Sequence, residues 1–226
     1  MRMDFNAHRD KPGWQGKKRR ESHESSFEQG RALSPKLRDP FSALAERQRE
    51  QVSSSVMPLT PDGLLAYLNA CGIVATTQSH PPVHTVAQAR ALRGSISGAH
   101  TKNLFLRDAR KNYFLVAVEE ETPVDLKALK LKLGARGGLS FGSPEALYEK
   151  LGVLPGAVTL LAAANDPQRE VMIAIDVALL EADFVNCHPL TNASTTTLAP
   201  SELLRFLALT GHEPLRISFA EDAVEA

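Results

Sequence analysis

The sequence predicts a single domain with a mixed α/β fold. Short apolar runs rich in strand-forming residues alternate irregularly with helical stretches that open on capping residues and close on glycine. Two of the apolar runs are joined by the short polar segment Asp108–Asn112, which is typical of a hairpin. A purely parallel sheet would need a regular strand–helix repeat, so we expect a mixed, mostly antiparallel, curved sheet flanked by helices over residues 57–226.

The helices are predicted from their ends. Ser, Thr or Asp at a helix start accepts backbone hydrogen bonds, proline suits the first turn, and glycine suits the residue after the last turn. On this basis helices start at Thr60-Pro61, Thr85, Asp125, Ser143-Pro144 and Ser201, and they end near Gly72, Gly94, Gly134, Gly152 and Gly211.

The strands are predicted from runs of β-branched, aromatic and aliphatic residues that lie between turn signals. These runs cover Asn103–Arg107, Tyr113–Val118, Leu139–Phe141, Val158–Ala164, Glu170–Val177, Phe184–Cys187 and Thr195–Leu198.

Residues 1–56 differ from the rest of the chain. They hold 12 Lys and Arg against 8 Asp and Glu, and they show no sustained hydrophobic period. This composition is typical of a disordered segment, although a short helix over Phe41–Gln51 also fits. Met57 directly precedes the first strong helix signal, so we interpret residues 1–56 as a disordered tail or an over-extended reading frame.

The overall composition is that of an ordinary globular protein, with 43% hydrophobic and 23% charged residues. No run approaches the roughly 18–20 apolar residues of a membrane span, and the N-terminus lacks the apolar core of a signal peptide. Cys71 and Cys187 are the two cysteines, too few for a disulfide framework, so we expect a cytoplasmic protein. The formal net charge is zero, and a nucleic-acid partner would therefore need a local basic patch.

A lysine interrupts the first long apolar run. Successive strand side chains point to opposite faces, so Lys102 shares a face with Leu104 and Leu106. Those leucines are expected to face the core, which aims the Lys102 amine into the interior or a pocket wall. A buried ammonium needs an anion or several carbonyl oxygens around it. The alternative is that Lys102 lies at the frayed start of the strand and reaches water.

Other constellations are weaker. The segment Gly134–Gly138 lacks the spacing and context of a phosphate loop and is interpreted as a helix stop and turn. His80 and His84 are separated by Pro-Pro, which prevents a helix from placing them on one face, so no metal site is expected. Cys187 and His188 are adjacent on a strand and point to opposite faces, which favours a small core residue over a thiol nucleophile for Cys187.

His188 stands where Pro189 breaks the strand, and strand ends adjoin loops that often carry ligand-facing groups. The pattern by itself favours a structural histidine over a ligand-facing one.

Taken together, these segments resemble the YbaK/prolyl-tRNA-synthetase-associated domain family, and within it the free-standing prolyl-tRNA editing deacylases. The resemblance extends from Leu59 to Phe219 in the family's order. The matching segments are His-Thr-Lys-Asn-Leu-Phe-Leu-Arg-Asp (100–108), Val-Asp-Leu-Lys-Ala-Leu (124–129), Leu-Ser-Phe-Gly-Ser-Pro-Glu (139–145), Leu-Gly-Val-Leu-Pro-Gly (151–156), Asn-Asp (165–166), Cys-His-Pro-Leu-Thr-Asn (187–192) and Thr-Gly-His-Glu-Pro (210–214).

The resemblance implies a hydrolase that removes a wrong amino acid, with alanine the leading candidate, from tRNA for proline. We expect no cofactor, no metal, because no cluster has ligand spacing, and no membrane, because no apolar run is long enough to span one. The expected partners are the acceptor end of the tRNA and, transiently, prolyl-tRNA synthetase, and the expected state is a monomer or weak dimer. A separate site that admits only small residues would complete a double sieve, because a proline pocket cannot strongly exclude alanine.

The family's site residues carry over to particular positions. Lys102 matches the essential lysine that is expected to hold the terminal adenosine and its ester, with Asn103 beside it. Gly156 begins the family's Gly-x-x-x-Pro loop, whose backbone amides are expected to face the substrate carbonyl. His188 matches the histidine that shapes the aminoacyl pocket. The remaining expected substrate-binding residues are Leu104, Asn165 and Asp166.

The sequence departs from the family at the end of that loop, where Leu160 replaces the proline. The next residues, Leu-Ala-Ala-Ala (161–164), are small or aliphatic where the family usually has Phe-Gly. This departure leaves the loop's rigidity and the pocket's size open. Two alternatives therefore stand beside alanine editing: editing of serine or cysteine, and a non-catalytic module that binds tRNA or a synthetase.

Basic residues cluster after Lys102, and we expect Arg107, Lys130 and Arg136 to contact the tRNA backbone. Arg136 lies on a glycine-flanked turn and is expected nearest the terminal base pairs. The alternative for the run Lys127–Lys132 is the solvated face of an amphipathic helix.

Overall fold

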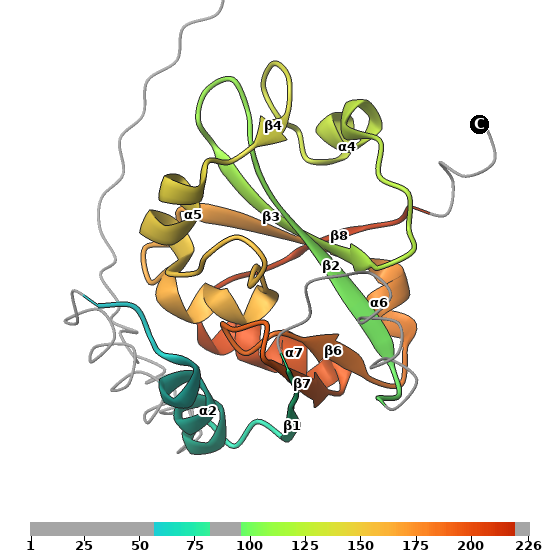
Figure 1. Ribbon diagram of the computed structural model, residues 1–226. Coiled ribbons are helices and arrows are strands. Elements are labelled where there is room, and N and C mark those ends of the chain that lie inside the picture. Colours follow the sequence, from blue (N-terminus) through green and yellow to red (C-terminus); the bar gives the residue numbers. More distant parts are fainter. Residues whose placement is uncertain (1–56, 82–95, 220–226) are drawn as a thin grey trace, which may run out of the picture. The chain divides into compact units, whose positions relative to one another are not determined.

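The protein is described by a computed structural model that covers residues 57–81 and 96–219 (Figure 1). Every described residue belongs to one compact unit of the chain. The predicted helix that starts at Thr85 and the helix over Phe41–Gln51 lie outside the described residues.

The described residues form one mixed sheet of eight strands in the order β1-β7-β6-β2-β3-β5-β8, with β4 pairing β2. The β2–β3, β2–β4, β1–β7 and β6–β7 pairs are antiparallel, whereas β2–β6, β3–β5 and β5–β8 are parallel. This confirms the predicted mixed α/β fold. The strands are β1 (Ala75–Ser79), β2 (Ala99–Arg107), β3 (Tyr113–Glu119), β4 (Ser140–Phe141), β5 (Val171–Asp176), β6 (Val185–Cys187), β7 (Ser194–Leu198) and β8 (Leu215–Ile217).

Apart from the helix Val177–Glu181, the described α-helices begin within one residue of their predicted starts. The side chains of Thr60, Asp125 and Ser143 each accept a backbone hydrogen bond at a helix start. Gly152 ends one helix in the left-handed conformation. The helices are α2 (Pro61–Ala70), α4 (Leu126–Lys132), α5 (Pro144–Leu151), α6 (Val177–Glu181) and α7 (Pro200–Leu209).

One predicted strand is wrong. Val158–Ala164 does not form a strand; instead Leu160–Asn165 forms the 3₁₀ helix η1. The Thr159 hydroxyl accepts a hydrogen bond from the Leu161 N–H at 3.2 Å and so caps this helix. When every residue of a short run is apolar, the sequence has no alternation of polar and apolar residues that would distinguish a helix from a strand. This explains the error. The sequence also gave no signal for β1, α6 or β8.

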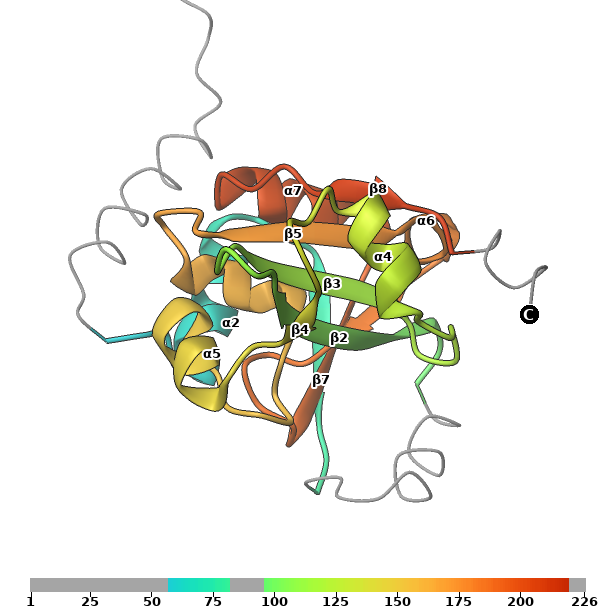
Figure 2. The same ribbon diagram turned by 90° about the horizontal axis from the view of Figure 1, so that it is seen from above.

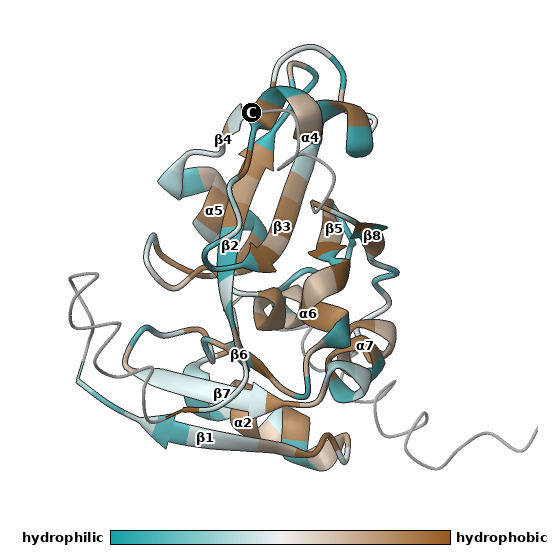
Figure 3. Cartoon of the chain, turned by 90° about the vertical axis from the view of Figure 1, so that its right-hand side faces the viewer, coloured by the Kyte–Doolittle hydropathy of each residue, from teal (hydrophilic) through white to brown (hydrophobic). Residues whose placement is uncertain are grey.

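The sheet is buried on both faces. In β3, Leu115 and Ala117 face a large cluster formed with α2, α5, η1, α6 and α7, whereas Phe114 and Val116 face a smaller cluster with α4 (Figure 2). All four side chains are nearly or completely inaccessible to solvent. This explains why β3 is hydrophobic along its length in Figure 3, while the outlying strand β7 is pale.

Asp108 joins two loops at one end of the sheet. Its carboxylate accepts hydrogen bonds from the backbone N–H groups of Arg110 (2.8 Å), Asn112 (3.0 Å) and Arg136 (3.0 Å), and from the Asn112 side chain (2.8 Å). The Ala109 N–H also donates to the Arg136 carbonyl at 3.0 Å. The β2–β3 turn is therefore tied directly to the turn that precedes β4, and we call these two turns the tip.

Replacing Asp108 with alanine is expected to lower the melting temperature, because four N–H donors lose one shared acceptor. Burial raises the pKa of Asp108, but the hydrogen bonds from Arg136, Asn112 and Arg110 outweigh it and lower the pKa from 3.8 to about 2. The carboxylate therefore stabilises the fold fully above pH 3.8, and this contribution is lost as the pH falls through about 2.

Thermal melting of the wild type and Asp108→Ala across this pH range tests the prediction. The difference in melting temperature between the wild type and Asp108→Ala should be constant near neutral pH and should become smaller as the pH is lowered. Asn69→Ala, on the exposed face of α2, is the control and should melt like the wild type. A pH-independent difference would show that the charge of Asp108 is unimportant.

Candidate functional site

Lys102 lies inside β2 and is not at a frayed strand start. It pairs with Val118 of β3, and its side chain is partly buried. The Lys102 Nζ donates hydrogen bonds to the backbone carbonyls of Glu120, at 3.0 Å, and of Thr122. Carbonyl oxygens therefore replace the water that the ammonium group gives up.

The turn that holds Lys102 follows β3 directly. The Thr122 N–H donates to the Glu119 carbonyl at 3.1 Å, and the Glu121 N–H donates to the Glu119 carboxylate at 2.9 Å. Pro123 restricts the preceding residue, Thr122, to extended conformations and so orients its carbonyl. Two of the three ammonium N–H groups of Lys102 are thus directed by a locally ordered turn.

His188 follows β6 and is partly buried. Its Nδ1 lies 3.3 Å from the Ser194 carbonyl. Burial lowers the pKa of His188; the Ser194 hydrogen bond and the charge of Glu120 act against this, and the charges of His80 and His100 act with it. β6 pairs with the start of β2 through His100 and Asn186, and the Glu120 N–H donates to the His100 carbonyl at 2.9 Å, so the strand that precedes His188 adjoins the turn that holds Lys102.

His80 extends the same region from the end of β1. Its Nε2 lies 3.0 Å from the Thr195 hydroxyl, and its backbone N–H donates to the Ala193 carbonyl at 2.9 Å. These two contacts join the end of β1 to the segment Ala193–Thr195. No group of three His, Cys, Asp or Glu side chains within residues 57–81 and 96–219 has metal-binding geometry.

Asn103 points to the opposite face of β2 from Lys102, because it is the next residue in the strand. Its Nδ2 donates to the Thr101 hydroxyl at 3.1 Å. Its Oδ1 is buried and has no hydrogen-bond partner in the described part of the chain.

Gly156 adopts a left-handed backbone conformation with φ of 91°, which favours glycine. A Cβ atom at this position would lie 4.0 Å from the Asn192 side-chain nitrogen, so the Gly156 loop adjoins the segment that follows His188. Leu160 is the first residue of η1. Because proline is favoured at the first position of a helix, the loss of the family's proline here removes backbone preorganisation without disrupting the helix.

The other predicted substrate-binding residues make structural contacts. Asn165 accepts a hydrogen bond from the Leu59 N–H at 2.8 Å and donates to the Leu151 carbonyl at 3.0 Å. Leu104 packs against the smaller core cluster. Their described contacts do not join them to Lys102 or His188, so a substrate-binding role for them remains a prediction.

Asp166 is also engaged within the fold. Its carboxylate accepts from the backbone N–H groups of Glu170 and Val171, both at 2.9 Å, and lies 3.3 Å from His212 Nε2. Burial raises the pKa of Asp166, but the contact with His212 and the two backbone hydrogen bonds outweigh burial and lower it. Its predicted role in substrate binding is likewise untested.

Cys187 is buried, and burial raises the pKa of its thiol to about 12 despite a hydrogen bond with Thr101. A thiol of this pKa stays protonated at neutral pH and is a poor nucleophile.

The predicted tRNA-binding residues are in different surroundings. Arg107 and Arg136 are exposed and lie at the tip, whereas Lys130 lies on α4 and is partly buried. The neighbouring Lys132 donates to the Ser218 carbonyl at 2.6 Å and lies over the Phe219 ring. The α4 lysines therefore do not act as one solvated row.

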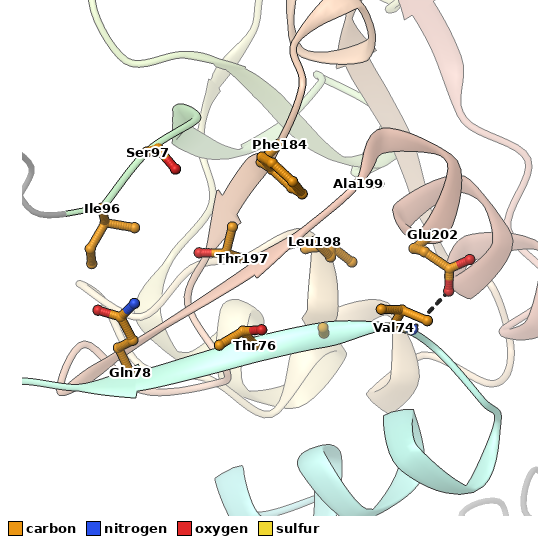
Figure 4. Close-up of a pocket in the computed structure, with 11 residues that line it drawn as sticks. Val74, Thr76, Gln78, Ile96, Ser97, Phe184, Thr197, Leu198, Ala199 and Glu202 are labelled. Carbon is orange, nitrogen blue, oxygen red and sulfur yellow. Dashed lines mark hydrogen bonds between the residues drawn. The ribbon is translucent and has the colours of Figure 1, made fainter.

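A separate cavity of about 300 Å³ lies between β1, β7 and the start of α7 (Figure 4). Val74, Phe184 and Glu202 are among its lining residues, and Glu202 accepts a hydrogen bond from the Val74 N–H at 2.9 Å. It contains none of the predicted site residues.

Sequence reasoning did not identify the turn Glu119–Thr122. Its signal was the Thr-Pro pair after three acidic residues, which marks an ordered turn directly after a strand. Nothing in the sequence linked that turn to Lys102, because the link depends on the β2–β3 register.

Comparison with known proteins defines the class of this fold and site. Residues 80–206 match the aminoacyl-tRNA editing domain family, and this is more than half of the chain. The chain therefore belongs to that family, which confirms the resemblance seen in the sequence.

Individual relatives agree. The chain is 37% identical over 181 residues to prolyl-tRNA synthetase associated domain-containing protein 1 of Danio rerio, covering 79% of this chain and 98% of that protein. It is 31% identical over 150 residues to the prolyl-tRNA editing protein ProX of Acetoanaerobium sticklandii, covering 66% and 91%. A solved structure of a candidate trans-editing enzyme for prolyl-tRNA synthetase superposes with a TM-score of 0.53 at 22% identity, over 80% of this chain and 98% of that one, and supports the fold. No helix among the described residues is long and apolar enough to cross a membrane.

The surroundings of His188 predict a titration that NMR can follow. Because burial dominates, its ring should titrate below 6.5 and should be neutral at pH 7. Glu120→Gln removes a charge that raises this pKa, so the midpoint should fall further. A midpoint above 6.5, or a rise in the variant, would show that His188 is solvated or paired differently.

Proposed function

We propose that this protein is a trans-editing hydrolase that removes a wrongly attached amino acid, with alanine as the leading candidate, from tRNA for proline. The observation that carries the proposal is the Lys102 ammonium, which the Glu120 and Thr122 carbonyls hold in a chain of the aminoacyl-tRNA editing family. The names of the prolyl-tRNA relatives support proline tRNA as the substrate.

The chemistry asks little of the protein. An aminoacyl ester is already activated, so the site must hold the ester, admit water and stabilise the developing oxyanion. Lys102 keeps one ammonium N–H beyond the two that its carbonyl partners accept, and this N–H would meet a phosphate or the developing charge. No side-chain nucleophile is required, which is compatible with the high pKa of Cys187.

The Gly156 loop would supply backbone donors. Its Ala157 N–H is used within the loop, because it donates to the Leu154 carbonyl at 3.0 Å. The N–H groups of Gly156 and Val158 have no such partner among the described residues and would face the substrate carbonyl. The His188 ring, near Asn192 in the sequence, would then limit the size of the amino acid.

The tip would bind the acceptor stem. Arg107, Arg110 and Arg136 are exposed there, and Asp108 holds the two turns together. A preorganised pair of turns binds phosphates without first losing backbone entropy. The tRNA is thus the main proposed partner, and contact with prolyl-tRNA synthetase would be transient.

Deacylation assays test the function. The wild type should hydrolyse alanyl-tRNA(Pro) and spare prolyl-tRNA(Pro). The same assay on seryl-tRNA(Pro) and cysteinyl-tRNA(Pro) tests the alternative substrates. Lys102→Ala should lower the rate by about 10²–10³-fold, as expected for loss of an electrostatic group at the reacting ester. Lys102→Arg should also fail, because a planar guanidinium does not fit a site built for an ammonium.

Lys127→Ala is the matched control, since Lys127 is exposed on α4, and melting curves exclude unfolding of the variants. Equal rates on alanyl and prolyl forms would remove the editing proposal. Binding of tRNA without any hydrolysis would favour the non-catalytic module.

Arg136→Ala tests the tip. If Arg136 contacts a phosphate, the variant's KM should rise on every tRNA. The slope of log binding constant against log salt concentration should also become shallower by about one. If it reads a base edge, the loss should depend on the first base pair of the acceptor stem. Arg216→Ala, on the exposed edge strand β8, is the control, and an unchanged KM for Arg136→Ala would place tRNA binding elsewhere.

A further inference from the structure

Phe141 is the most exposed aromatic side chain in the described part of the chain. It is 63% exposed and lies in β4, which pairs with the outer edge of β2 beside the tip. A single exposed aromatic residue is ordinary on a protein surface. Phe141 differs in how firmly its backbone is held and in what surrounds it.

The backbone around Phe141 is held closely against β2. Phe141 pairs with Leu106, and the next residue, Gly142, donates its N–H to the Phe105 carbonyl at 2.9 Å. A Cβ atom on Gly142 would lie 2.4 Å from the Phe105 ring, so only glycine fits where the chain leaves β4. The exposed ring therefore stands on an ordered edge of the sheet, and a ligand that contacts it orders little additional backbone.

Phe141 lies on the same face of the sheet as Lys102. Directly paired strand residues share a face, so Phe141 lies with Leu106, and Leu106 lies with Lys102, four residues earlier in β2. Four strand residues span about 13 Å and neighbouring strands are about 4.8 Å apart, so the two backbone positions are roughly 14 Å apart. Between them the outer edge of β2 has no strand partner within the described chain, because β6 and β4 pair only with its two ends.

This separation suits an unpaired nucleic-acid strand. Stacked nucleotides are about 3.4 Å apart, so roughly 14 Å is the length of the few unpaired nucleotides that follow the acceptor stem of a tRNA. An acceptor end whose terminal ester lies at Lys102 would therefore bring an earlier unpaired base to Phe141.

The tip supplies positive charge next to the ring. Ser140 pairs with Arg107, so the tip begins one residue from Phe141. Arg110 and Arg136 are also exposed there. Cationic side chains that contact phosphates, together with an aromatic ring that stacks on a base, are the combination by which proteins hold single-stranded nucleic acid.

We propose that the Phe141 ring stacks on an unpaired base of the tRNA acceptor end, between the stem and the esterified adenosine. This inference rests on the proposed function, and it gives Phe141 a role in positioning the substrate and none in the hydrolysis itself. Phe141 and Lys102 then hold the 3′ end at two points on one face of the sheet. Because every base has a π-face, the contact accepts any base and leaves the recognition of tRNA identity to other residues.

Binding to minihelices tests this without requiring hydrolysis. The probe is an acceptor-stem minihelix of tRNA(Pro) with its complete 3′ end and no amino acid. Three comparison probes each carry an abasic site at one of the unpaired positions before the terminal adenosine. Phe141→Ala should weaken binding of the intact probe by about tenfold or more, the scale of one stack between a base and an aromatic ring. On the one abasic probe that lacks the stacked base, the wild type and Phe141→Ala should bind equally.

Further variants separate stacking from other roles of the ring. Phe141→Trp keeps a π-face and should bind like the wild type, whereas Phe141→Leu keeps only an apolar side chain and should bind nearly as weakly as Phe141→Ala. The slope of log binding constant against log salt concentration should be the same for the wild type and Phe141→Ala, because no phosphate contact is removed. Tyr148→Ala is the matched control, since Tyr148 is 48% exposed on α5, which packs against the opposite face of the sheet. Melting curves check that each variant folds.

An unchanged affinity of Phe141→Ala for the intact probe would overturn the inference, as would an equal loss on the intact probe and all three abasic probes. These outcomes are separate from those of the proposed function. A wild type that shows the base-dependent contact but does not hydrolyse alanyl-tRNA(Pro) would retain the inference and overturn the enzyme. A wild type that hydrolyses the ester, while Phe141→Ala binds the intact probe as tightly, would do the reverse.

Discussion

The placement of an ammonium group in the face of a sheet constrains much of this structure. Lys102 occupies a position whose neighbours on the same face, Leu104 and Leu106, are apolar and pack against α4. The charge is tolerated because two backbone carbonyls accept its hydrogen bonds. Those carbonyls reach the ammonium because β3 ends at Glu119 and the chain turns at once, so the position of the charge depends on where the neighbouring strand ends.

Strand β2 connects the features that bear on function. Its middle presents Lys102 to one face and Asn103 to the other, and its end leads into the tip through Arg107 and Asp108. Short partners at each end leave the middle of its outer edge open. A single strand therefore connects the proposed ester site to the proposed tRNA-binding turns, and a site built on a strand is held more precisely than one built on loops.

The sequence predicted helices better than strands, for a local reason. Caps such as Thr60, Asp125 and Ser143 act within one helical turn, so their meaning does not depend on distant residues. Buried apolar runs lack this property. Leu160–Asn165 reads as a strand, yet its place under the sheet and the Thr159 cap make it helical. The edge strands β1 and β8 were missed because their pairing with β7 and β5 is what makes them strands.

The sequence by itself determined the fold class, the family and the identity of Lys102, Asn103, Gly156 and His188 as residues of interest, because these follow from short-range patterns and motif order. The tertiary structure alone decided what each one touches. The carbonyl partners of Lys102 lie about 20 residues away along the chain, and the Asp108–Arg136 link spans 28. Such contacts depend on strand register and on how loops close. Both are determined by the pairing of distant segments and cannot be predicted from the local sequence.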